Sequence, residues 1–167
     1  EFWKYTVPLT VRRHHGVLLF CAALFITFFI TGFYSSQHDE TFVREMLSDS
    51  YVNMTEENIE KGKPFGVYAE GGALLMWLGI MINNLFVAFG YFAQGLLLCI
   101  PLIISLLTEG VRLGAFEQMF FAKGLGMQSV LTVFIHGTLE ISAIVIAGAA
   151  GVVLGKGWMF PGTGKRL

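Results

Sequence analysis

The stretch SVLTVFIHGTLEISAIVIAGAAGVVLG, residues 129–155, decides the class of fold. It is apolar over nearly its whole length, and about 20 such residues in a helix cross the hydrocarbon core of a bilayer. Two ionisable side chains, His136 and Glu140, interrupt it. A charged group at the bilayer centre costs about 2.5–3.5 kcal/mol even on the mildest scale, so both should face other protein groups. The segment therefore predicts a transmembrane helix with a polar point directed at the protein interior.

The composition of the whole chain indicates the same class. Hydrophobic residues make up 54% of the 167 residues and charged residues only 14%, whereas soluble domains have about 25% charged residues. The mean hydropathy is +0.65. A net charge of −1 gives no reason to expect a nucleic-acid partner. We therefore expect an all-α, polytopic transmembrane helical bundle with short interfacial helices.

Hydropathy predicts about four spans, at residues 16–34, 70–89, 91–108 and 129–155. The uncharged run 71–108 is twice as long as one span, so two helices are expected within it. The break between them should fall at a weak helix position, which is Asn83, Asn84, Gly90 or Gly95. An even number of crossings places both ends of the chain on the same side of the membrane.

The charges predict which side that is. Residues 35–64 form an acidic loop with seven acidic and three basic residues, whereas the N-terminal flank and the tail from Lys156 onwards are basic. By the positive-inside rule the loop is extracytoplasmic and the N-terminus is cytoplasmic. Within the loop, Asn53 should cap a short helix at 54–61. The sequence is interpreted as one transmembrane domain, 1–167, that is a fragment of a longer chain.

Two further segments are expected at the membrane interface. Residues 1–15 mix aromatic and basic side chains, a composition typical of an interfacial segment that leads into a span. Residues 109–128 have balanced charge and carry Phe116, Met119, Phe120 and Phe121. They predict an amphipathic segment that lies in the outer interface.

Three motifs resemble the integral membrane family of stage II sporulation protein M. They are INNLFVAFGYFAQGLLL at 82–98, TEGVRLGA at 108–115 and HGTLEISAIVIAGAAGVVLG at 136–155. The family pattern has an Asn-Asn pair that opens an apolar helix, a small-residue element, and a helix that begins His-Gly-x-x-Glu. Glu109 stands where the family pattern has Asn, so no role of that Asn is carried over.

The resemblance implies a polytopic protein of the bacterial inner membrane with at least one further span beyond this fragment. In sporulating bacteria the namesake helps to organise peptidoglycan-remodelling proteins during engulfment. The resemblance therefore implies a role in assembling partner proteins in the cell envelope. It does not decide whether the organism sporulates.

His136 and Glu140 are four residues apart, so they lie on one face of a helix and can hydrogen-bond to each other. Three roles are open: structural polar contacts between helices, a proton or ion pathway, and a metal site. A metal site would need a third ligand, for which Glu109 and Glu70 are the candidates. Asn83 and Asn84 diverge by about 100° on a helix, so at most one of them can share a face with a given partner.

Small residues predict where helices approach each other closely. On a helix, small side chains spaced by four residues let two backbones come into contact. The positions with this role are Ala147, Gly148, Gly151, Gly155, Gly110 and Gly114.

These features favour a non-catalytic integral membrane scaffold or assembly subunit. Its expected partners are other membrane or envelope proteins, the lipid bilayer and further copies of itself. The acidic loop and residues 116–121 are the surfaces expected to bind partner proteins. No catalytic residue and no cofactor are predicted, and an enzyme is the less favoured class. Two other functions stay open: a transporter or channel component that uses His136, Glu140 and Asn84, and an intramembrane metal-dependent hydrolase.

Overall fold

The computed structural model describes residues 1–65 and 73–160, apart from the side chains of 73–77 and 133–136. Every regular element within these residues is a helix, as predicted. The elements in chain order are η1 (Phe2–Thr6), α1 (Val7–His38), α2 (Glu40–Leu47), α3 (Asp49–Glu60), α4 (Ala73–Gln94), α5 (Ile100–Ala122) and α6 (Gly126–Met159).

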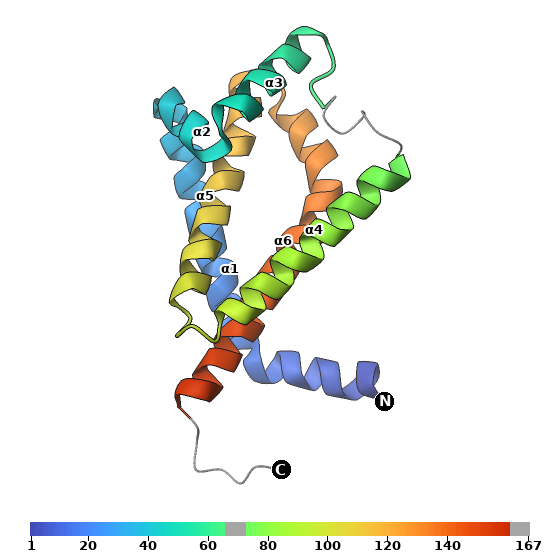
Figure 1. Ribbon diagram of the computed structural model, residues 1–167, viewed down its shortest axis with the longest axis vertical. Helices are drawn as coiled ribbons and strands as arrows, with labels where there is room; N and C mark the ends of the chain where they lie inside the picture. The colour runs from blue at the N-terminus through green and yellow to red at the C-terminus, as the bar shows by residue number, and fades with distance from the viewer. Residues whose placement is uncertain (66–72, 161–167) are drawn as a thin grey trace.

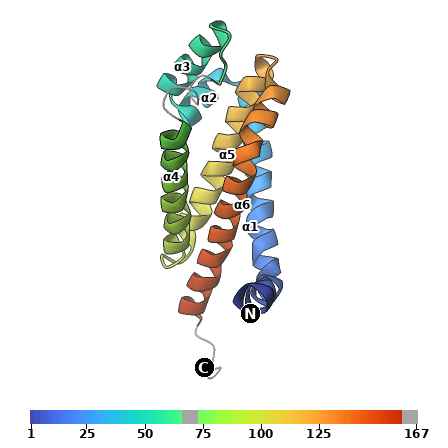
Figure 2. The same cartoon turned by 90° about the vertical axis from the view of Figure 1, so that its right-hand side faces the viewer.

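The four long helices α1, α4, α5 and α6 form a bundle, and the short helices α2 and α3 lie over one end of it (Figures 1 and 2). The chain runs towards that end in α1, returns in α4, runs towards it again in α5 and returns in α6. The start of α1 and the end of α6 therefore lie together at the opposite end. η1 and the first turns of α1 turn aside there (Figure 1).

Two of these helices are long and apolar enough to cross a membrane in the part of the chain that the structure describes. They are Phe2–His38, which joins η1 to α1, and Gly137–Met159 in α6. A shorter apolar helix, Leu78–Gln94, belongs to α4. The predicted apolar character of the bundle is thus observed in α1, α4 and α6, while α5 carries Glu109, Arg112 and Glu117.

The break within the long uncharged run lies later than the expected spans placed it. α4 continues through Asn83, Asn84 and Gly90 and ends at Gln94, so the predicted boundary between spans 70–89 and 91–108 is wrong, and the break begins at Gly95, one of the four positions named for it. The turn at 95–99 contains Leu98 and Cys99 with positive φ, and proline in the first turn of α5 then starts the new helix. A helix inside an apolar environment satisfies its own backbone hydrogen bonds, which lets α4 continue through two asparagines.

α5 also corrects the expectation of an interfacial segment at 109–128. These residues continue α5 up to Ala122 and then, after a short turn, begin α6. Phe116, Met119 and Phe120 are buried and pack against Val43 of α2 and Val52 of α3. They form the base on which the short helices rest, so they are not a free surface for a partner.

Local capping explains the two short helices. The Asp39 side chain accepts a hydrogen bond from the Thr41 amide at 2.8 Å and caps α2. Ser48, with a positive φ of 75°, accepts from the Tyr51 amide at 3.4 Å and caps α3. The predicted helix at 54–61 is therefore present but begins earlier, at Asp49, and Asn53 lies inside it. It ends where Gly62 adopts a φ of 70°.

A second cluster of buried side chains joins the four long helices to one another. Its members come from α1, α4, α5 and α6 and are Cys21, Phe25, Tyr91, Leu102, Leu106, Ile144, Val145 and Ala149. Apart from Tyr91, these side chains carry no hydroxyl, amide or charged group, and the Tyr91 hydroxyl donates to the Ser105 carbonyl at 3.0 Å. The interior between the helices is therefore packed, and the site below lies towards the α2–α3 end.

Candidate functional site

A cavity of about 570 Å³ opens between α1, α2, α5 and α6, close to the start of α3. Its apolar wall consists of side chains from α1, α5 and α6, which are Phe25, Leu113, Phe116, Ile141 and Ile144. Its charged side chains are Glu45 of α2, Glu109 and Arg112 of α5, and Glu140 of α6. Ligand sites in proteins have this size and this mixture of apolar walls with a few polar groups.

The charged groups of the cavity interact with one another. The Arg112 guanidinium donates a hydrogen bond from Nη1 to Oε2 of Glu109 at 3.5 Å. The Glu109 carboxylate lies close enough to Glu140 for the two negative charges to repel each other, and the Asn84 side chain lies beside the Glu140 carboxylate. Residues from α4, α5 and α6 therefore meet at one polar point.

The other predicted polar residues fall in different places. Asn83 is exposed, and its amide donates to Oδ1 of its neighbour Asn84 at 3.5 Å. The side chain of His136 and the whole of Glu70 lie outside the described residues. Within the described part of the chain, no three His, Cys, Asp or Glu side chains form a group that could hold a metal ion.

Two of the predicted small residues of α6, Gly151 and Gly155, face α4 and the turn that follows it. A Cβ on Gly151 would lie 2.8 Å from the Tyr91 carbonyl oxygen, and one on Gly155 would meet the Gly95 carbonyl. Such distances leave no room for a side chain, so the two backbones are in direct contact. Gly148 instead faces the Leu106 side chain of α5, at 3.1 Å, and Ala147 is partly buried beside the interhelical cluster.

Close backbone packing at glycines also joins α5 to α1. A Cβ on Gly110 would lie 2.8 Å from the Phe25 carbonyl oxygen, and one on Gly114 would meet the Phe29 carbonyl. Gly32 of α1 approaches Val111 in the same way, although Gly32 was not among the predicted packing residues. Since Gly110 lies beside Phe25 and Gly114 beside Phe29, α1 and α5 run in the same direction.

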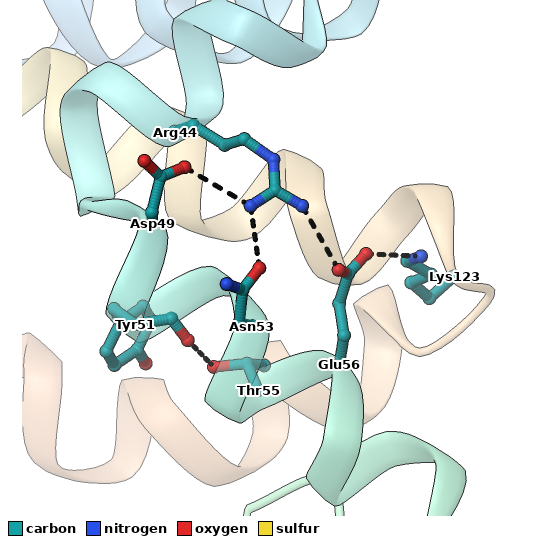
Figure 3. A network of polar contacts seen from close by, with 7 residues as sticks. All are labelled: Arg44, Asp49, Tyr51, Asn53, Thr55, Glu56 and Lys123. Atoms are coloured by element: carbon teal, nitrogen blue, oxygen red, sulfur yellow. Dashed lines mark hydrogen bonds and ion pairs between the residues drawn. The ribbon is translucent and has the colours of Figure 1, made fainter.

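A polar network that the sequence did not predict fastens the short helices (Figure 3). Arg44 of α2 donates from Nη1 to Asn53 at 2.7 Å and to Asp49 at 3.3 Å, and from Nη2 to Glu56 at 3.3 Å. Glu56 in turn accepts from Lys123, just after α5, at 2.8 Å. The sequence could have indicated that Arg44 pairs with several carboxylates, because it is the one basic residue among the first six charged residues of the acidic segment 35–64.

The charge of Glu56 responds to this environment. The hydrogen bond from Lys123, with the nearby charges of Lys123 and Arg44, holds the pKa of Glu56 below its ordinary value, although partial burial acts in the opposite direction. Glu56 is therefore ionised at neutral pH and connects α3 to the α5–α6 turn by a charge-assisted hydrogen bond.

Sequence reasoning also missed Glu117. This glutamate is 1% exposed, next to the fully buried Ser129 at the start of α6. Neither its carboxylate oxygens nor the Ser129 hydroxyl has a hydrogen-bond partner of good geometry among the described residues. A carboxylate without a cationic partner is costly to bury. In the sequence, the position of Glu117 between Phe116 and Phe120 could have indicated that it is buried.

The bundle and its apolar helices define the chain as an α-helical protein with candidate membrane spans. The family model of stage II sporulation protein M matches residues 21–167, so the chain belongs to this membrane-associated family. The resemblance drawn from the three sequence motifs is thereby confirmed. Searches of curated proteins and of solved structures found no match.

Proposed function

We propose that this protein is a non-catalytic integral membrane scaffold that assembles partner proteins in the bacterial cell envelope. In this proposal α1, α4, α5 and α6 cross the inner membrane. The start of α1, with Arg12 and Arg13, lies at the end opposite α2 and α3. The positive-inside rule then places both ends of the bundle's chain in the cytoplasm and the two short helices outside.

The observation that carries the proposal is the way α2 and α3 are held. We call these two helices, residues 40–60, the outer cap. Val43 and Val52 pack on Phe116, Met119 and Phe120 of α5, and the Arg44 network adds polar ties to α3 (Figure 3). A cap fixed by both an apolar base and charged bonds is a preorganised surface, which binds partners at a lower entropic cost than a flexible loop.

The outward surface of the cap and its flanks is acidic. Besides Glu45, which lines the cavity, five carboxylates are exposed there: Asp39, Glu40, Asp49, Glu57 and Glu60. Concentrated negative charge speeds association with a positively charged partner and suppresses binding of acidic ones. The chemistry of the surface therefore fits a basic extracytoplasmic domain or segment of another envelope protein.

Charge reversal tests the scaffold. We expect the double variant Glu40→Lys, Glu60→Lys to keep normal membrane levels but to lose partner proteins in a co-purification census from native membranes. Glu1→Lys makes one such charge reversal at the opposite end of the bundle and should leave the census unchanged. An identical set of partners for the cap variant and the wild type would refute the proposal.

A second function, as part of a transporter or channel, is favoured by the cavity that Glu109 and Glu140 line. Charged residues inside a membrane bundle often mark ion or substrate pathways. Glu140→Gln separates the two functions, because it keeps hydrogen bonding but removes the charge. A well-folded Gln variant that fails to complement a deletion strain would favour transport over the scaffold.

A further inference from the structure

The cavity between α2, α5 and α6 has a charge imbalance. Three carboxylates line it, from Glu45, Glu109 and Glu140, against the single guanidinium of Arg112. Arg112 already pairs with Glu109. Neither Glu45 nor Glu140 forms an ion pair with a basic side chain among the described residues. The cavity therefore has an excess of negative charge that the described part of the fold does not neutralise.

The rest of the wall is hydrophobic. Phe25 and Ile144 are buried members of the interhelical cluster, and Leu113 and Ile141 pack against it. The cavity volume of about 570 Å³ lies in the range of about 300–1,000 Å³ that is usual for small-molecule sites. A small inorganic cation would leave this apolar wall in contact with water or empty, whereas a molecule with an apolar chain would cover it.

From these two properties we infer that the cavity binds an amphiphile with a positively charged amine head and a hydrocarbon chain, a property beyond the scaffold role. The ammonium group lies at the Glu109 and Glu140 carboxylates and relieves their mutual repulsion. The chain lies against Phe25, Leu113 and Ile144. The Asn84 amide of α4 lies beside the Glu140 carboxylate, and Phe25 belongs to α1, so the site is complete only when all four long helices are assembled.

The test uses dodecylamine, which is protonated at neutral pH, with dodecanol and dodecanoate as probes of the same chain length. Binding to the purified full chain in nonionic detergent is measured by native mass spectrometry and by the shift of the thermal unfolding midpoint. We expect dodecylamine to bind at least about tenfold more tightly than either control. Equal binding of dodecylamine and dodecanol would overturn the inference, as would no binding at all.

Variants assign the binding to the cavity. Glu140→Gln should weaken dodecylamine binding about tenfold, and Glu45→Gln should weaken it in the same direction. Glu45 is exposed on α2, so its variant keeps the test valid if Glu140→Gln does not fold. Glu60→Gln removes an exposed carboxylate outside the cavity and serves as the matched control. An equal loss in Glu60→Gln, or undiminished binding in both cavity variants, would overturn the inference.

A competition experiment identifies the source of the amine. Dodecylamine binding is compared in nanodiscs of phosphatidylglycerol alone and in nanodiscs that also contain phosphatidylethanolamine. Competition by phosphatidylethanolamine would support the site with a membrane lipid as occupant. Undiminished binding would support it with an amine amphiphile from another source. The scaffold proposal is tested independently, because the cap variants change neither Glu45 nor Glu140.

Discussion

At the scale of single residues, the polar point inside the bundle depends on Glu140 and the groups around it. The Asn84 amide and the Glu109 carboxylate lie beside its carboxylate, so a substitution that removes hydrogen-bonding capacity leaves polar neighbours against an apolar side chain. That penalty is about 1–3 kcal/mol for a buried group. Substitutions at Glu140 can therefore distinguish a structural role of this side chain from a chemical one.

We predict that Glu140→Leu lowers the free energy of unfolding by about 1–3 kcal/mol, because the neighbouring Asn84 amide would then face an apolar side chain that cannot accept a hydrogen bond. Glu140→Gln keeps an acceptor and should stay close to the wild type. Unfolding in mixed micelles measures both. Complementation of a deletion strain by the Gln variant is expected for a scaffold, and equal stability of the Leu and Gln variants would contradict the hydrogen-bonding role.

Glu56 gives a prediction on pH. Its pKa is lowered in the folded protein, so its contribution to stability is present above the ordinary value of 4.5 and is lost as the pH falls through the lower, folded-state value. Because the pair with Lys123 is partly exposed, the effect should be below about 1 kcal/mol. In unfolding titrations from neutral to acidic pH, Glu56→Gln should flatten this dependence, and Glu60→Gln should preserve it. An unchanged acid profile in Glu56→Gln would show that the tie contributes nothing.

At the scale of helices, the backbone contacts between glycines determine how the bundle packs. Gly151→Ala should destabilise the protein by about 1–3 kcal/mol, because its Cβ would lie 2.8 Å from the Tyr91 carbonyl oxygen. Gly157, in the same helix, has no atom within 4 Å of its Cβ position, so Gly157→Ala should be neutral or slightly stabilising. Thermal unfolding in detergent compares the two. Equal midpoints would contradict the close approach of α4 and α6.

The sequence predicts some of these helices better than others, because hydropathy measures apolar composition and not backbone conformation or tertiary contact. Hydropathy finds α1 and α6 because long apolar runs have one interpretation. It divides the long uncharged run too early, at residue 90 and not at Gly95, where the turn begins. Apolar composition does not reveal the positive φ of Leu98 and Cys99 on which that turn depends. It also misses that the aromatic residues of α5 are covered by α2 and α3, since that contact joins segments about 70 residues apart in sequence.

The residues of the candidate site likewise include some that the sequence predicts and some that only the structure reveals. Glu140 and Asn84 stand out in the sequence because polar residues are costly in apolar runs. Glu45 and Arg112 do not, because a charged residue in a charged segment has an ordinary explanation on the surface. Only the folded arrangement of α2, α5 and α6 brings them into one cavity.

At the scale of the whole molecule, the proposed function requires that four helices cross the membrane and that the outer cap and the α5–α6 turn lie on the same, external side. In the structure the two are joined by Glu56 and Lys123, so they cannot lie on opposite sides of a bilayer. The start of α1 lies at the other end of the bundle (Figure 2).

Site-directed labelling of intact cells with an impermeant thiol reagent tests this membrane arrangement. Single cysteines are placed at Ser50 of the cap, at Ala122 at the end of α5 and at Lys4, all exposed, in a background where the buried Cys21 and Cys99 are replaced by alanine. We predict that Ser50→Cys and Ala122→Cys are labelled from outside and that Lys4→Cys is labelled only after the membrane is permeabilised. Labelling of only one of the first two, or of Lys4→Cys in intact cells, would contradict the four-crossing arrangement.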